Sequence, residues 1–333
     1  MSAANASTWL IGPRKEILPD VTDTKPFPVI AIGAIHYDTI AHASETIRPE
    51  TSTPARFAAK PGGVATNLAR SLSRLGVSVR LVGAVGDDGA ARELSRQLTG
   101  EGLQLETVPR SGFATGQYLA LHDPSGALAA ACVDDRVLAE APADLFDSLL
   151  AKLTADMPTE TLWFADANLP ADMLRRLVTQ IRPARLIANA VSEAKAIRLK
   201  PLLADLDCLM LNRGEAIALT DLPRDAAAED LVSALVTSGL NRFVLTSGAE
   251  DVMVLEDGAV SRFRPKATRI TDVTGAGDAL MAGTLAALAR GRNLTAAMPF
   301  GLAAAALTLS STGALAEGLS WQALHQFDQT DKI

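Results

Sequence analysis

Short apolar runs that end at small or polar residues alternate along this chain with stretches of helical spacing. Val29–Ile32 stops at Gly33, and Val64–Leu75 follows Pro61-Gly62-Gly63 with apolar residues three and four apart. An apolar run without polar alternation is typical of a strand buried on both faces, as in parallel sheets. The repeated order of strand, glycine-rich loop and helix predicts an α/β fold with a Rossmann-like, mostly parallel sheet flanked by helices.

The same pattern predicts the remaining elements of this body. Strands are expected at Val79–Val85, Thr161–Asp166, Arg185–Ala190, Asp207–Leu211 and Phe243–Thr246, and helices at Pro170–Gln180, Glu215–Leu219, Ala228–Ser238 and Ala279–Arg290.

Two segments break this order, because Asp38–Ala59 and Phe113–Asp134 show rough strand alternation, and Asp123–Gly126 is a hairpin-turn sequence. They predict a small β-strand lid formed by insertions at about residues 38–60 and 111–135. We expect an N-terminal extension at 1–28, one α/β domain at 29–319, and a C-terminal helix and tail at 320–333.

Composition restricts the class of protein. The 333 residues are 48% hydrophobic and 21% charged, which is ordinary for a globular chain, and the net charge of −7 disfavours nucleic-acid polymers as partners. The only cysteines, Cys132 and Cys208, suit a reducing compartment, and no secretion signal is evident, so we expect a cytoplasmic protein. Leu294–Ala316 lacks charge, but its prolines, glycines and hydroxyls favour a buried helix over a membrane span.

The most informative segment is Ile270–Asp278, which precedes the helix expected at Ala279–Arg290. Its Gly275-Ala276-Gly277 turn would expose backbone N–H groups at a helix N-terminus, where the helix dipole favours an anion such as phosphate. Asp278 could then accept the proton of an attacking hydroxyl during phosphoryl transfer. The alternative is a tight turn with Asp278 as its helix cap.

Together with Pro61–Asn67, the segment Asp272–Ala279 resembles the signatures of the ribokinase-like (PfkB) carbohydrate kinases. The resemblance covers about Val29–Leu319. It implies a kinase domain with a β lid, ATP as phosphoryl donor, Mg²⁺ and often K⁺. It also implies that Asp278 is the catalytic base and that Gly275, Ala276 and Gly277 form the anion hole.

Further motifs match the nucleotide side of that family. Asn212 and Glu215 resemble its Asn-x-x-Glu motif, which implies a role for Glu215 in holding Mg²⁺ through water; alternatively, the two are a helix-capping pair. Thr246 and Gly248 resemble its nucleotide loop, although Asp251 stands where a second glycine is common.

A site for K⁺ is expected near Asp272 and Thr274, beside the loop Ser311–Ala314. Backbone carbonyls would supply the ligands.

The acceptor side is expected at residues that follow the first strand and open the first helix. Asp38 can accept two hydroxyl hydrogens from a diol, and His36 stands where relatives often place Asn. Gly62 and Gly63 would allow close backbone approach to a sugar, and Asn67 would direct its amide at it. An Asx-turn for Asp38 and a packed loop histidine for His36 remain alternatives.

A second part of the acceptor site is expected at two loops. Asn168 follows a strand end and is expected at the acceptor, whereas Asp166 is expected at most to cap the next helix. In the lid, alternation separates Thr115 and Gln117 from Tyr118, and we expect Gln117 on the sugar side.

Several strings, among them Thr115–Asp123 and Ala165–Asn168, resemble the pseudouridine kinase subfamily. This implies transfer of the ATP γ-phosphate to the 5′-hydroxyl of pseudouridine. A ribokinase or another sugar or nucleoside kinase is the alternative within the family, and a catalytically idle sensor is the alternative outside enzymes. The expected partners are a small nucleoside or sugar and a second copy of the chain paired through the lid, with no nucleic acid and no membrane.

Overall fold

The computed structural model describes residues 25–184, 186–266 and 268–329. Most of the expected N-terminal extension, residues 1–24, lies outside the described residues, as do Arg185 of one expected strand and residues 330–333 of the expected tail.

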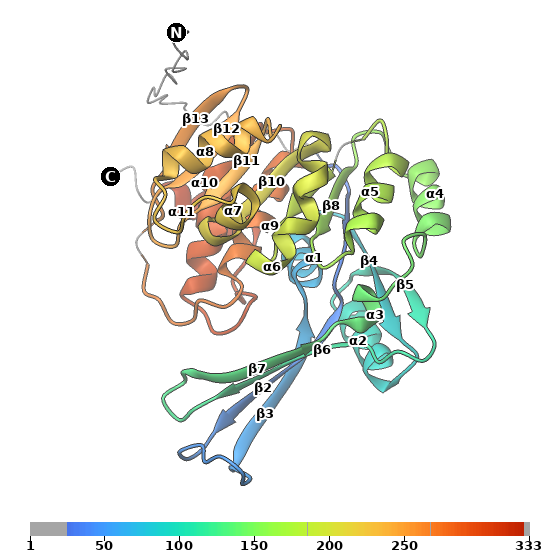
Figure 1. Ribbon diagram of the computed structural model, residues 1–333, viewed down its shortest axis with the longest axis vertical. Helices are drawn as coiled ribbons and strands as arrows, with labels where there is room; N and C mark the ends of the chain where they lie inside the picture. Colours follow the sequence, from blue (N-terminus) through green and yellow to red (C-terminus); the bar gives the residue numbers. More distant parts are fainter. Residues whose placement is uncertain (1–24, 185, 267, 330–333) are drawn as a thin grey trace.

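A large, mostly parallel sheet forms the centre of the body (Figure 1). Its strands run in the order β13-β12-β11-β10-β9-β8-β1-β4-β5, and only the pairs β11–β12 and β12–β13 are antiparallel. Their bounds are β1 (Val29–Ile32), β4 (Val79–Gly86), β5 (Gln104–Arg110), β8 (Leu162–Asp166), β9 (Leu186–Asn189), β10 (Leu206–Asn212), β11 (Phe243–Thr246), β12 (Val252–Glu256) and β13 (Ala259–Phe263). The predicted fold class is confirmed.

Helices cover both faces of this sheet. The apolar cluster on one face includes side chains of α1, α2, α9 and α10, and the cluster on the other includes side chains of α4, α5, α7 and α8. The helices are α1 (Val64–Arg74), α2 (Gly89–Gly100), α3 (Arg136–Ala139), α4 (Asp147–Asp156), α5 (Ala171–Gln180), α6 (Glu193–Ala196), the 3-10 helix η1 (Ile197–Asp205), α7 (Arg213–Thr220), α8 (Ala228–Thr237), α9 (Ala276–Leu288), α10 (Leu294–Leu309) and α11 (Trp321–Gln329). Within the described ranges, no helix is both long and apolar enough to cross a membrane.

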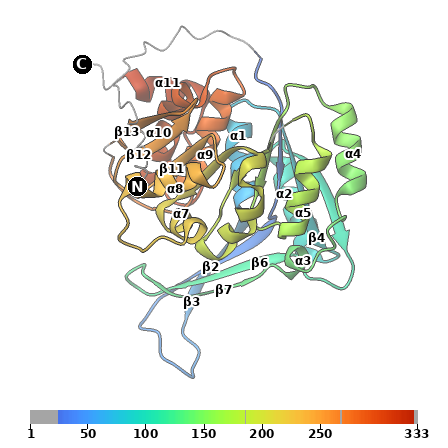
Figure 2. The same cartoon turned by 45° about the horizontal axis from the view of Figure 1, so that its top comes forward.

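A second, smaller sheet projects from the body as a ribbon (Figures 1 and 2). It has the strand order β3-β2-β6-β7, with β2 (His36–Ala43), β3 (Ala55–Gly62), β6 (Gly116–His122) and β7 (Leu128–Asp134). The expected turn joins β6 to β7, with Asp123 N donating to Ala127 O at 2.9 Å. This sheet fits the predicted lid.

The strand order places a break in the chain path beside β1. β1 pairs with β4 on one side, and the sheet continues from β4 to β5. On its other side β1 pairs with β8, and the sheet continues in the opposite direction through β9. Loops at such a switch point diverge at the carboxyl ends of the strands and leave room for a ligand. The loops that follow β1 and β8 carry several of the predicted site residues, so the fold gathers them at this edge.

Candidate active site

The glycine turn before α9 has the geometry that the sequence predicts. Gly275 caps the helix with φ 75°, and a Cβ there would lie 2.5 Å from the Cα of Ala314, so only glycine fits this left-handed, crowded position. A Cβ on Gly277 would meet nothing within 4 Å, so that side of the turn is open. The turn thus offers backbone N–H groups at the N-terminus of a long helix, an arrangement suited to an anion.

Asp278 lies in the first turn of α9 and is partly buried, but Gly275 is the N-cap, so the cap alternative for Asp278 is wrong. Its carboxylate Oδ2 accepts a hydrogen bond from Asn67 Nδ2 of α1 at 2.8 Å. Burial raises the pKa of Asp278 to about 7; the Asn67 hydrogen bond opposes this rise, and the charges of Asp166 and Asp38 add to it. A carboxyl group that titrates near neutral pH is suited to act as a general base.

Asn67 therefore directs its amide at Asp278. It was expected to face the sugar, and the structure gives it this additional partner.

Asp166, at the end of β8, joins the loops of the switch point. Its side chain is fully buried, and it accepts hydrogen bonds from the backbone N–H groups of Ala34 (3.1 Å), Ala65 (2.9 Å) and Asn168 (3.0 Å). The expectation that Asp166 at most caps the next helix is wrong, because Pro170 is the N-cap of α5 and makes no side-chain cap. Asp166 instead holds the ends of β1, α1 and β8 together.

Asp38 and His36 lie two residues apart on β2, so their side chains share one face of the lid strand. Burial raises the pKa of Asp38 to about 6, against the charge of Lys60, and burial lowers the pKa of His36 to about 4, with the charge of Lys195 acting in the same direction. Among the described residues, the buried atoms Asp38 Oδ1 and His36 Nε2 have no hydrogen-bond partner. Buried polar atoms without partners are costly, and a ligand could satisfy both.

The glycines Gly62 and Gly63 are required by close contacts. A Cβ on Gly62 would lie 1.9 Å from Asp38 Oδ2, and one on Gly63, where φ is 95°, would lie 2.4 Å from Ala34 O. Gly62 lets the end of β3 lie against the Asp38 side chain of β2, and Gly63 brings the start of α1 close to the loop after β1.

Asn168 is almost fully buried and is held by its neighbours. Its Oδ1 accepts from Lys195 Nζ at 2.6 Å, and Lys195 also pairs with Asp135 at 2.7 Å. The sequence interpretation named neither Lys195 nor Asp135. Lys195 follows β9 at the carboxyl edge of the sheet, so the rule that identified Asn168 could also have identified it.

Gln117 lies on the face of the lid opposite Asp38 and His36. The register pairs Asp38 with Tyr118 and Tyr37 with Gln117, and paired residues of parallel strands point to the same side of the sheet. Tyr118 therefore shares the face of Asp38, and Gln117 is exposed on the opposite face. The contact of Gln117 with a sugar stays a prediction, which its exposure on the face opposite Asp38 does not favour, since strand alternation predicts two faces but not which one meets the ligand.

Asn212 and Glu215 form the capping pair that the sequence left open. Asn212 N donates to Glu215 Oε2 at 2.8 Å, Asn212 Nδ2 donates to Oε1 at 2.8 Å, and Glu215 N donates to Asn212 Oδ1 at 3.0 Å. Burial raises the pKa of Glu215. Each carboxylate oxygen keeps a lone pair, so the pair also fits the indirect, water-mediated binding of Mg²⁺.

The nucleotide-side loop follows β11. Gly248 has φ 64°, and a Cβ there would meet nothing within 4 Å, so this loop is open; Thr246 Oγ1 donates to Leu211 O at 3.5 Å. Asp251, which replaces the common second glycine, pairs with Arg264 at 3.5 Å. The loop sits beside Asn212, because Asn212 and Thr246 are in register on β10 and β11.

The turn expected to hold a cation is closed by Asp272. Its Oδ1 accepts from Thr274 N and its Oδ2 from Gly313 N, both at 2.8 Å. The carboxylate therefore joins the turn before α9 to the loop after α10, as the sequence expectation paired them.

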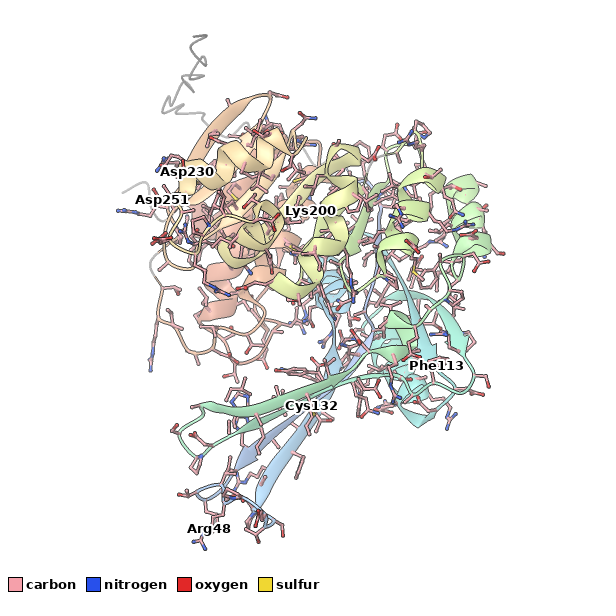
Figure 3. The ribbon with its side chains drawn as sticks, viewed as in Figure 1. Arg48, Phe113, Cys132, Lys200, Asp230 and Asp251 are labelled. Atoms are coloured by element: carbon pink, nitrogen blue, oxygen red, sulfur yellow. The ribbon has the colours of Figure 1, made fainter. Side chains whose placement is uncertain are left out.

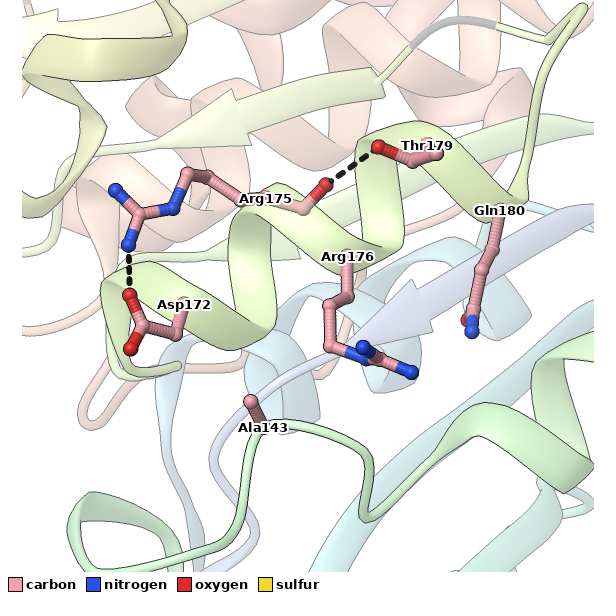
Figure 4. Close-up of a pocket in the computed structure, with 6 residues that line it drawn as sticks. All are labelled: Ala143, Asp172, Arg175, Arg176, Thr179 and Gln180. Atoms are coloured by element: carbon pink, nitrogen blue, oxygen red, sulfur yellow. Dashed lines mark hydrogen bonds and ion pairs between the residues drawn. The ribbon is translucent and has the colours of Figure 1, made fainter.

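A surface hollow lies elsewhere, on the outer side of α5 (Figure 4). Its charged side chains are engaged in ion pairs, Arg175 with Asp172 and Arg176 with Asp147. None of the predicted site residues lines it.

An α/β body with an anion-binding turn, an adjacent buried carboxylate and a β lid is the architecture of a phosphotransferase that acts on an alcohol. A model of the pfkB family of carbohydrate kinases matches residues 28–321. The chain therefore belongs to the pfkB family.

The known proteins to which the chain is similar include kinases that are named for different substrates. Pseudouridine kinase of Escherichia coli is 27% identical over 289 residues, covering 85% of this chain and 90% of that protein. Ribokinase of Haemophilus influenzae is 24% identical over 294 residues, covering 85% and 92%. Among solved structures, a carbohydrate kinase from Agrobacterium tumefaciens has a TM-score of 0.81 at 30% identity, covering 91% of this chain and 97% of that one.

Proposed function

We propose that the protein transfers the γ-phosphate of ATP to the 5′-hydroxyl of a nucleoside, and that the nucleoside is pseudouridine. The observation that carries the kinase part is the pairing of Asp278 with Asn67 at the N-terminus of α9, beside an open glycine turn. A sensor would have no need for a carboxyl group that titrates near pH 7 at this point.

In this mechanism Asp278 accepts the proton of the 5′-hydroxyl. The O5′–Pγ bond forms as the bond between Pγ and the β,γ-bridging oxygen breaks, and ADP leaves. The N–H groups of Gly275, Ala276 and Gly277, with the dipole of α9, stabilise the charge on the transferred group. Asn212 and Glu215 would hold Mg²⁺ through water, and the bound metal would shield the phosphate charge.

The choice of a nucleoside over a free sugar rests on His36. Asp38 offers a carboxylate for a ribose diol, and the buried Nε2 of His36, two residues away, offers a second hydrogen-bonding atom that has no partner among the described residues. A nucleobase edge supplies further donors and acceptors. The similarity to E. coli pseudouridine kinase supports the same choice, whereas the similarity to H. influenzae ribokinase supports ribose as the alternative acceptor.

A panel of acceptors tests this proposal. Purified protein is assayed for ADP release with pseudouridine, uridine, cytidine, adenosine and ribose, with the Asp278→Asn variant as control. We expect kcat/KM for pseudouridine to exceed that for ribose by ~10² or more, because an unpaired buried polar group costs that much in specificity. Faster turnover of ribose or adenosine would overturn the substrate, and no turnover of ATP with any acceptor would favour the sensor.

We further propose that two copies pair through their lids. The lid exposes large apolar side chains, with Phe57 70% exposed, Leu128 55%, Val133 54% and Leu119 41%. Among the described residues, no further strand pairs with the outer edges of β3 and β7, and exposed apolar edges favour pairing (Figure 3, where Cys132 marks β7). Light scattering should give a dimer that Phe57→Ser weakens; a monomer at assay concentration would contradict this.

The compartment we propose is the cytoplasm, where ATP is available. The free thiols of Cys132 and Cys208 suit it.

A further inference from the structure

Lys60 is a lid residue whose side chain reaches the loop beside the proposed phosphate-binding turn. It lies on β3 directly across from Asp38, on the same face of the lid. Its Nζ is 3.2 Å from the point where a Cβ on Gly313 would stand. Within the described part of the chain, the side chain of Lys60 makes no hydrogen bond or ion pair. A lysine without a partner, held over a loop of the site, needs an explanation.

Gly313 belongs to the structure that supports the anion turn. Its backbone N–H donates to Asp272, whose other oxygen accepts from Thr274, and the next residue, Ala314, packs against Gly275. A charge beside Gly313 is therefore linked to the N–H groups that would receive the phosphate, because the neighbouring Ala314 packs against Gly275 of that turn.

The charge of Lys60 reaches carboxylates on both sides of this region. For Asp272, burial acts to raise the pKa, but hydrogen bonds from Thr274 and Gly313 and the charge of Lys60 lower it overall. For Asp38, burial raises the pKa and Lys60 opposes the rise. Lys60 thus lies close enough to act electrostatically on the turn and on the acceptor carboxylate.

The sequence resemblance implied a K⁺ ion at this turn. A second cation beside an unpaired ammonium would be repelled, and the loop expected to flank the K⁺ site already has the ammonium of Lys60 beside Gly313. The residues present therefore fit a resident ammonium better than an exchangeable ion.

We propose that Lys60 is a positioning residue that supplies to the Asp272–Gly313 turn the positive charge that K⁺ was expected to bring. The kinase reaction does not depend on alkali cations for this reason. Because Lys60 is carried by the lid, its charge reaches the turn only when the lid lies over the site. Lid closure and ordering of the anion turn are then one event. The kinetic part of this inference rests on the proposed function.

Alkali-cation dependence tests the inference. ATP turnover is measured in potassium, sodium and choline chloride at equal ionic strength for the wild type, Lys60→Ala and Lys60→Arg. Arg56→Ala is the matched control, because Arg56 is a cation on the same face of β3 but lies farther along the lid, opposite His42.

We expect the wild type to vary by less than about twofold among the salts. Lys60→Ala should lose about 10- to 100-fold in choline chloride, less than the ~10²–10³-fold that loss of a direct oxyanion-hole donor costs because Lys60 acts through the turn, and should recover most of this in potassium chloride. Lys60→Arg should stay close to the wild type, and Arg56→Ala should match it. A wild type that potassium activates severalfold, a Lys60→Ala variant unaffected in every salt, or a loss that potassium does not repair would each overturn the inference.

Thermal unfolding gives a readout that does not depend on the reaction. Potassium chloride should raise the Tm of Lys60→Ala in a saturable way relative to choline chloride, and should leave the Tm of the wild type unchanged. If this pattern appears while no acceptor is phosphorylated, the proposed function fails and the role of Lys60 stands. If turnover is normal and the pattern is absent, the role of Lys60 fails alone.

Discussion

Removing the amide of Asn67 should move the pH dependence of the reaction to higher pH. Burial holds the pKa of Asp278 at about 7, and the hydrogen bond from Asn67 Nδ2, 2.8 Å long, works against that rise. A hydrogen bond to a charged group contributes ~1.5–3 kcal/mol, which corresponds to ~1–2 pKa units. Because Asp278 is only partly buried, solvent replaces some of the lost bond, and we expect the lower value of ~1 unit in Asn67→Ala.

The assay is kcat/KM for the acceptor from about pH 5.5 to 9.5. In the wild type, the rate should rise through an acidic limb centred near pH 7, because Asp278 must lose its proton to act as a base. In Asn67→Ala the limb should centre ~1 unit higher. The variant should therefore be about 10-fold slower near pH 6 and approach the wild type above pH 9.

Two results would refute this reasoning. A limb that does not move means that Asn67 does not tune Asp278. A loss of the same size at every pH means that Asn67 acts on the acceptor, as the sequence predicted, and not through the base. Asp278→Asn serves as the control, because it should abolish the limb itself.

Other predictions concern stability, binding and packing. Asp278→Asn should lower kcat by ~10²–10⁴-fold with ATP affinity unchanged by calorimetry. Because the folded protein keeps the Asp278 proton to about pH 7, the wild type loses stability as pH rises toward that value. Asp278→Asn does not titrate and escapes this loss. Its free energy of unfolding in urea, relative to the wild type, should therefore be ~2 kcal/mol higher at pH 8 than at pH 5. Hydroxyl donors of a bound acceptor should lower the pKa of Asp38 from about 6. Acceptor binding should therefore release protons near pH 6 and none near pH 8, which calorimetry in two buffers measures. Gly33→Ala should reduce the free energy of unfolding by ~1–3 kcal/mol, because its Cβ would lie 2.3 Å from Asp166 Oδ2.

Most of the body sheet could be predicted because its central parallel strands are buried on both faces, whereas the parallel edge strand β5, which has no buried residue, was missed. Val29–Ile32 is fully apolar and fully buried as β1. In β8 and β11 the apolar residues are buried as well, except Leu162, which is half-buried at the start of β8. The hairpin β12–β13 was missed because it lies at the antiparallel edge. The signal was present: Asp257 and Gly258 join the strands with φ 51° and 73°, as a two-residue hairpin turn requires.

The candidate site was less predictable, because its contacts join residues far apart in the chain. Asn67 and Asp278 are separated by 211 positions, and Asp166 binds Ala65 across 101. Strand ends indicate which loops meet, but they do not indicate which polar atoms pair. The hydrogen-bond partners of Asp166 and Lys195 therefore left no local trace, although both residues lie at or after strand ends, whereas the glycine turn at Gly275 had a signal in its own sequence.

The number of hydrogen bonds that each site carboxylate accepts distinguishes a structural carboxylate from those available to a ligand. Asp166 accepts three backbone hydrogen bonds, so its oxygens are committed to the loops of the switch point. Asp278 accepts one bond, from a side chain, and Asp38 has an oxygen with no partner among the described residues. Native proteins satisfy nearly all buried polar atoms, so those left open mark places where a ligand completes the structure. By this criterion we propose Asp38 and Asp278 as the carboxylates available to an acceptor, whereas Asp166 holds together the loops from which the site is built.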